Sequence, residues 1–114
     1  MTGVLSLIQV IGYLNSNDTK KAIRYLKERR KEYQFVDLKE RSLSKRELEN
    51  IFMHFSPQDC IDTTSACYRK RLAYMVYDAA QELEENNELF ITPILRCRGK
   101  VALGFDAQFL EENS

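Results

Sequence analysis

Short hydrophobic segments alternate with longer amphipathic segments in the first third of the chain. Residues 5–14 form a β-rich apolar run, which is typical of a central strand covered on both faces. Residues 18–31 carry apolar side chains at helical spacing and end in basic residues, which favours a helix. Residues 33–38 alternate and predict a second strand. Because the connections are short, these segments form a βαβ unit with parallel strands.

The middle of the chain is predicted to be helical. Ser44 and Glu47 have the spacing of a capping box, in which the serine caps the third amide and the glutamate bonds back. The Ser56–Pro57 pair ends this helix, because a residue before proline disfavours helical geometry. A polar connection then reaches about Thr64. Apolar residues at helical spacing predict a further helix from Tyr68 to Leu83.

The last part of the chain is predicted to form two strands and a short helix. Residues 89–95 predict a third strand, which forms a hairpin with residues 101–105. Asp106 is expected to cap a terminal helix over residues 107–112. Pro93 lies within the third strand, where a proline is acceptable as a cis-proline at the strand entrance.

The fold class expected from this order is α/β. We expect a four-stranded mixed sheet flanked by helices, with a helical insertion between the βαβ unit and the final ββα unit. The length of 114 residues fits one domain that spans residues 1–114.

Composition and charge exclude few classes of function. The chain has 17 basic and 17 acidic residues, so its net charge gives no case for direct nucleic-acid binding. The apolar start lacks a basic leader region and is too short to cross a bilayer. We therefore expect a cytoplasmic protein with no membrane association.

The cysteines and the single histidine give no metal site. Cys60, Cys67 and Cys97 are odd in number and lack Cys-x-x-Cys spacing, which argues against a disulfide framework and a zinc site. His54 lies in an apolar stretch and is expected to be a packed helix residue. No metal and no cofactor are therefore expected.

The turn after the first strand, Asn15–Ala22, contains no cysteine. In thioredoxin-like proteins this turn carries the reactive thiol, because the helix N-terminus stabilises a thiolate. Together with the segments Asp62–Ser65, Thr92–Leu95 and Val101–Asp106, in this order, the turn resembles the arsenate reductase family, which includes ArsC-like proteins and the Spx transcriptional regulators. The resemblance covers nearly the whole chain and implies a thioredoxin-like fold.

The resemblance also implies that the catalytic residues of the family are missing. Ser16 stands where the family has its redox cysteine, and Thr64 and Thr92 stand where it has arginines that bind the oxyanion. No catalytic residue is therefore expected. The corresponding pocket is expected to consist of Asn15, Ser16, Asn17, Thr19, Lys20, Thr64, Thr92 and Pro93.

These replacements change the chemistry that the pocket can perform. A serine hydroxyl is a poor nucleophile without an adjacent base, and threonine cannot bind an oxyanion bidentately as arginine does. Ser16 is expected to cap the helix instead. We therefore expect a binding or regulatory protein without arsenate reductase activity, and family analogy makes the transcription machinery a candidate partner.

Three alternatives remain open. The chain could be a glutathione-dependent oxidoreductase that uses Cys67, whose neighbouring cations would lower its pKa, or Cys97, which lies between two arginines. The N-terminus of the first helix could hold an anion with help from Lys20 or Lys21. The chain could also be a homodimer rather than a monomer, with tyrosines as interface anchors, namely Tyr13, Tyr25, Tyr68, Tyr74 and Tyr77.

Overall fold

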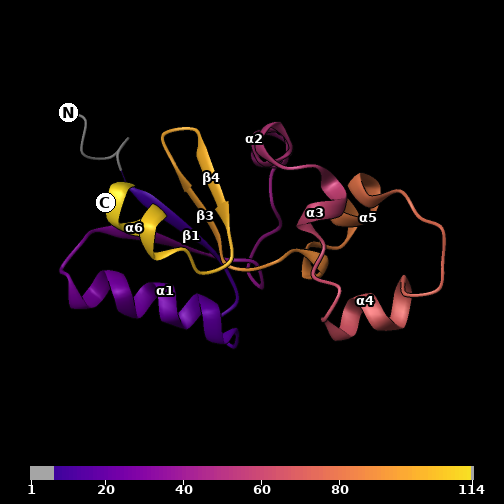
Figure 1. Cartoon of the computed structure of the whole chain (residues 1–114), viewed down its shortest axis with the longest axis horizontal. Coiled ribbons are helices and arrows are strands. Elements are labelled where there is room, and N and C mark those ends of the chain that lie inside the picture. The colour runs from indigo at the N-terminus through magenta and orange to yellow at the C-terminus, as the bar shows by residue number, and fades with distance from the viewer. Residues whose placement is uncertain (1–6, 114) are drawn as a thin grey trace. The chain divides into compact units, whose positions relative to one another are not determined.

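The computed structural model describes residues 7–113 and divides the chain into two compact units. Unit 1 combines the residues up to Arg41 with those from Thr92 onward, and unit 2 comprises residues 42–91 (Figure 1). The predicted insertion between the βαβ and ββα segments is confirmed, because unit 2 interrupts unit 1 between them. The assignment of residues 1–114 to one domain stays a prediction.

Unit 1 contains a four-stranded mixed sheet, as predicted. The strand order is β2-β1-β3-β4, in which β1 and β2 are parallel and the other neighbours are antiparallel. The strands are β1 (Ile8–Gly12), β2 (Tyr33–Asp37), β3 (Ile94–Cys97) and β4 (Lys100–Leu103). The helices of this unit are α1 (Asn17–Glu28) and α6 (Ala107–Asn113).

One face of the sheet forms the core of unit 1 together with α1 and α6. Successive strand residues point to opposite faces, so Ile8 and Val10 share a face with Leu95 of the neighbouring strand. These side chains pack with Ala22, Leu26, Cys97, Ala102, Phe109 and Leu110 in one buried cluster. Figure 1 shows α1 and α6 beside the sheet. As predicted, Asp106 begins α6, where its carboxylate accepts the Phe109 N–H at 3.0 Å.

Unit 2 is built from short helices. They are α2 (Lys45–His54), α3 (Pro57–Cys60), α4 (Ala66–Arg71), α5 (Ala79–Glu85) and the 3-10 helix η2 (Asn87–Leu89). The predicted capping box is present: Ser44 Oγ accepts the Glu47 N–H at 3.1 Å, and Glu47 Oε1 accepts the Ser44 N–H at 2.8 Å. Ile51, Leu83 and Leu89 are fully buried in this unit.

The prediction of one helix from Tyr68 to Leu83 is wrong. α4 ends at Arg71, and α5 begins only after Asp78, whose carboxylate caps it by accepting the Gln81 N–H at 3.3 Å. Met75 and Val76 fit the helical period but are exposed, so no burial holds them in a helix. The local cap at Asp78 therefore starts a separate helix.

Other boundaries also differ from the sequence prediction. The polar connection contains α3, which begins at Pro57, since proline is tolerated at the first helical position. The third strand begins at Ile94 rather than Leu89, because Pro93 cannot donate to a ladder; the Thr92–Pro93 peptide bond is cis, as expected. His54 is exposed at the end of α2 rather than packed.

The first strand and the first helix are both shorter than predicted. β1 covers Ile8–Gly12, and residues 5 and 6 of the predicted strand lie outside the described part of the chain. α1 ends at Glu28, and Arg30 has a φ of 55° in the left-handed region, which stops the helix before Lys31. Within residues 7–113, no helix is long and apolar enough to cross a membrane.

The capping box of α2 gives a test of local stability in unit 2. Replacement Ser44→Ala removes an acceptor from the first turn and should lower the free energy of unfolding by about 1 kcal/mol. Ser56 precedes α3 without making a side-chain cap hydrogen bond, so Ser56→Ala is the matched control and should change stability by less. Urea titration measures both. Equal losses in the two variants would contradict the capping role.

Candidate functional site

The N-terminus of α1 is closed by a serine hydroxyl. Ser16 has an extended backbone conformation, and its Oγ accepts the Thr19 N–H at 3.3 Å. The Ser16 N–H in turn donates to the Tyr13 carbonyl at 3.0 Å, which forms the turn between β1 and α1. The predicted capping role of Ser16 is therefore confirmed. The hydroxyl satisfies an amide that would otherwise lack a partner in the helix.

Thr19 brings the end of β1 close to the first turn of α1. Its side chain is fully buried, and its Oγ1 makes no hydrogen bond. A Cβ placed on Gly12 would lie 2.6 Å from this oxygen and 3.4 Å from the Cβ of Thr92. Gly12 is therefore required by the close approach, and Thr19 and Thr92 meet around it. This part of the predicted pocket, with the adjoining Pro93, is assembled within unit 1.

Thr64 belongs to unit 2 and is held by a local turn. Its N–H and hydroxyl both donate to the Asp62 carboxylate, at 3.0 and 2.6 Å. Arg69 Nη2 donates to the Thr64 carbonyl at 2.9 Å, and Ser65 caps α4 by accepting the Tyr68 N–H. The inclusion of Thr64 in the same pocket as Ser16 stays a prediction, as does that of the exposed Asn17.

A surface hollow of about 440 Å³ lies beside the start of α1. Two residues of the predicted pocket, Asn15 and Lys20, line it together with Leu14. Sequence reasoning missed Leu14 and three further lining residues, namely Tyr13, Asp37 and Lys39. A signal was present, since these residues end or follow parallel strands, whose carboxyl ends meet at one edge of a sheet.

The charges of this hollow are mixed. Lys20 and Lys39 bring two cations, and Asp37 brings a carboxylate whose Oδ1 accepts the Lys39 N–H at 2.9 Å. Asp18 adds a further negative charge in the first turn of α1. The arrangement suits a polar ligand with both donors and acceptors more than a simple oxyanion.

The two thiols of unit 2 are not activated. Burial, followed by the Asp59 carboxylate, raises the pKa of Cys60 to about 11, and its Sγ lies 3.5 Å from the Ser56 carbonyl that accepts from it. The pKa of Cys67 is also raised, first by burial and then by Glu88, which outweigh Arg71 and Lys70. The neighbouring cations Arg71 and Lys70 do lower the pKa of Cys67, as expected, but burial and nearby carboxylates raise it by more, so the pKa is raised overall.

Cys97 is remote from Ser16 within unit 1. Ile94, next to Pro93, pairs with Ile11 near the carboxyl end of β1, whereas Arg96 pairs with Gln9 toward the other end. Cys97 therefore lies at the edge of the sheet opposite to the start of α1. It is buried, and its Sγ donates to the Asn113 carbonyl at 3.4 Å.

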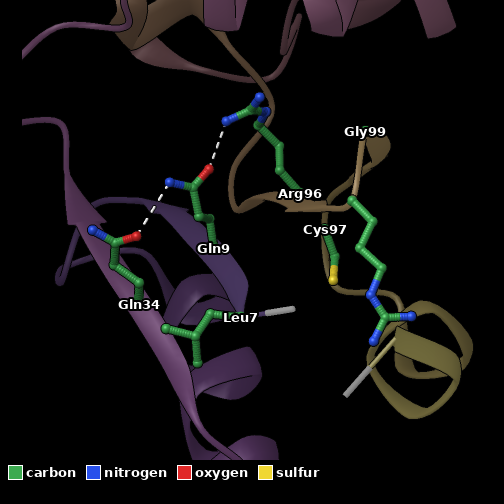
Figure 2. A pocket seen from close by; sticks show the side chains of 7 residues that line it. Leu7, Gln9, Gln34, Arg96, Cys97 and Gly99 are labelled. Atoms are coloured by element: carbon green, nitrogen blue, oxygen red, sulfur yellow. Dashed lines mark hydrogen bonds between the residues drawn. The ribbon is translucent and has the colours of Figure 1, made fainter. Parts of the chain in front are cut away.

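A smaller pocket of about 210 Å³ lies beside Cys97 (Figure 2). Gln34, Gln9 and Arg96 form a row across β2, β1 and β3, where Gln9 Nε2 donates to Gln34 Oε1 at 3.3 Å and Arg96 Nη1 donates to Gln9 Oε1 at 2.5 Å. These hydrogen bonds connect the side chains of neighbouring strands. Among residues 7–113, no group of three or more His, Cys, Asp or Glu side chains is placed to hold a metal ion.

Solved structures identify the fold. The YffB protein superposes with a TM-score of 0.81 at 18% identity, over 94% of this chain and 99% of that protein. An arsenate reductase from Vibrio cholerae gives a TM-score of 0.74 at 16% identity, over 94% and 97% of the two chains. An arsenate reductase (ArsC) related protein from Brucella melitensis gives 0.71 at 20% identity, over 93% and 92%.

The chain therefore has the thioredoxin-like fold of arsenate reductase (ArsC) family proteins. No protein-family model matches the sequence, and no curated protein is significantly similar to it. With identities of 15 to 21% to the structural neighbours, the likeness defines the fold, and the residues around Ser16 must define the chemistry.

The unpartnered hydroxyl of Thr19 gives a direct test of the packing at Gly12. Replacement Thr19→Val keeps the shape of the side chain and removes a buried polar atom that has no partner, so it should raise the free energy of unfolding by about 1 kcal/mol. Thr64→Val is the matched control, because it breaks the hydrogen bond to Asp62 and should bring no gain. Denaturant titration compares the two. A loss of stability in Thr19→Val would contradict this account.

The thiol of Cys67 gives a test of the electrostatics of unit 2. Because its pKa is raised, its thiolate fraction at neutral pH is below that of a free cysteine, and its alkylation should become fast only as the pH rises through that raised value. Rates measured with iodoacetamide against a cysteine peptide check this. Replacement Glu88→Gln should speed labelling at neutral pH, whereas Glu111→Gln, in unit 1, should not. Labelling of Cys67 faster than the peptide would contradict the raised pKa.

Proposed function

We propose that this chain is a non-catalytic protein of the arsenate reductase type that acts by binding. The observation that carries this proposal is the hydroxyl of Ser16 at the N-terminus of α1, engaged as a helix cap. The family resemblance places a redox cysteine at this position. A hydroxyl cannot cycle through a disulfide, and a serine attacks only when an adjacent base takes its proton.

The positions of the native thiols support the same proposal. Two of them have raised pKa values, and the third is buried at the opposite edge of the sheet from the start of α1. A nucleophilic cysteine needs a lowered pKa and access to its substrate. These thiols therefore favour a binding protein over a glutathione-dependent oxidoreductase that uses Cys67 or Cys97.

The proposed role is regulatory, and the proposed partner is another protein. The resemblance to Spx regulators suggests the transcription machinery as that partner. The hollow beside α1, with Tyr13, Lys20 and Asp37 among its lining residues, offers a surface with both apolar and charged groups for such contact. A cytoplasmic location belongs to the proposal, since Cys60, Cys67 and Cys97 form no disulfide, as is usual in a reducing compartment.

Reductase assays with matched variants test the loss of thiol chemistry. The wild-type chain should give no arsenate reduction above background with glutathione and glutaredoxin. In Ser16→Cys, the new thiol should be alkylated at neutral pH at least roughly tenfold faster than the native ones, because the N-terminus of α1 stabilises a thiolate. Ser42→Cys, at an exposed position in unit 2, is the control for simple exposure.

Two results would count against the proposal. Turnover by the wild-type chain that survives Ser16→Ala and disappears with Cys67→Ser or Cys97→Ser would establish the oxidoreductase alternative. Absence of binding to purified RNA polymerase, measured with the chain immobilised, would remove the transcription machinery as partner. The assays are independent, so the loss of chemistry and the choice of partner are tested separately.

A further inference from the structure

The segment between α4 and α5 presents an apolar tip to solvent. Tyr74 and Val76 are fully exposed, and Met75 is 62% exposed. The tip follows three consecutive cations, Arg69, Lys70 and Arg71, in the last turn of α4, of which Arg71 pairs with Glu82 at 3.1 Å. Three adjacent exposed apolar side chains beside a basic turn are unusual on a surface that only faces water.

Unit 2 also contains a groove whose charged lining is mainly acidic, whereas the turn beside the tip is basic. The groove, about 370 Å³ in volume, lies between α2 and α5 and is floored by Leu48, Phe52 and Ala80. Glu49, Asp78 and Glu84 bring three carboxylates to it, against the single cation of Lys45. The groove is therefore apolar at its base and mainly acidic at its rim. Its volume lies in the range of roughly 300–1,000 Å³ that is typical of binding pockets.

The tip and the groove complement each other in charge and in polarity. The tip offers apolar side chains next to cations, and the groove offers an apolar floor next to carboxylates. They are also contiguous, because Asp78 lines the groove two residues after Val76. A surface that contains both halves of a contact is self-complementary, and a two-fold axis would form the contact twice.

We propose that a second copy of this chain occupies the groove, so that the tip Tyr74–Val76 of each copy inserts between α2 and α5 of the other in a two-fold dimer. The formal net charge of zero removes the long-range repulsion that would oppose pairing of identical chains. This surface lies wholly in unit 2, so the dimer is independent of the proposed loss of thiol chemistry at Ser16.

Sedimentation velocity of the full chain over a wide concentration range tests the proposal. The wild-type chain should show a monomer–dimer equilibrium that weakens with added salt, because exposed charges are screened. Met75→Asp at the tip and Glu84→Lys at the rim should each raise the dimer dissociation constant by roughly tenfold or more. Leu14→Asp and Glu40→Lys, which make the same kinds of change in unit 1, should leave it unchanged.

Exchanging the charges of the tip and the groove distinguishes charge complementarity from a general weakening of the dimer by mutation. Lys70→Glu should also weaken the dimer, whereas the double variant Lys70→Glu/Glu84→Lys, which swaps the signs on tip and rim, should bind more tightly than either single variant. All these positions are exposed, so circular dichroism should confirm folded chains.

Three outcomes would overturn the proposal. A wild-type chain that stays monomeric at all concentrations would exclude the dimer. Species that grow beyond a dimer would exclude the two-fold arrangement in favour of an open head-to-tail contact. Binding of a monomeric chain to anionic lipid vesicles through Met75 would assign the tip to a membrane surface instead.

Discussion

The close approach of α1 to the end of β1 is the constraint on which unit 1 depends. Gly12 has no side chain, and the space that a Cβ would occupy lies 2.6 Å from Thr19 Oγ1. This contact lets α1 bury Ala22 and Leu26 against β1 and α6. It also fixes the direction in which the first turn of α1 faces, and therefore where Ser16 and the hollow beside it lie.

The same constraint does not require a cysteine at the start of α1. A helix N-terminus needs an acceptor for its free amides, and the hydroxyl of Ser16 supplies one. The sheet, the cis peptide bond before Pro93 and the packing at Gly12 place no demand on sulfur at position 16. The fold by itself therefore does not determine which chemistry, if any, the start of α1 performs.

Strong local signals allowed much of the fold to be predicted. The apolar run of β1, the capping box at Ser44 and the cap at Asp106 each have one dominant physical cause, and each is present in the structure. The predicted helix through Met75 failed because periodicity does not report burial, and these apolar residues face water. Tertiary packing, absent from a local pattern, decides such segments.

The candidate site was predictable only where a short segment builds it. The cap at Ser16 follows from residues three positions apart, whereas the meeting of Gly12, Thr19 and Thr92 depends on the pairing of β1 with β3 across most of the chain. The pKa of Cys67 could not be predicted from its sequence neighbours, because Glu88, distant in sequence, has a larger effect on it than Arg71 or Lys70.

The buried hydroxyl of Thr19 is not explained by packing in unit 1. A side chain without polar atoms, such as valine, or a cysteine, which packs as a small hydrophobic group, would fill the same space without leaving an oxygen unpaired. Threonine therefore carries a cost in stability that packing does not require. A position chosen for packing alone would not carry this cost, and Thr19 directly precedes Lys20, which lines the hollow at the start of α1. Departures of this kind from the best local choice are found mainly where function as well as folding shapes a segment, so the stability and ligand binding of Thr19→Val would show whether the cost serves more than packing.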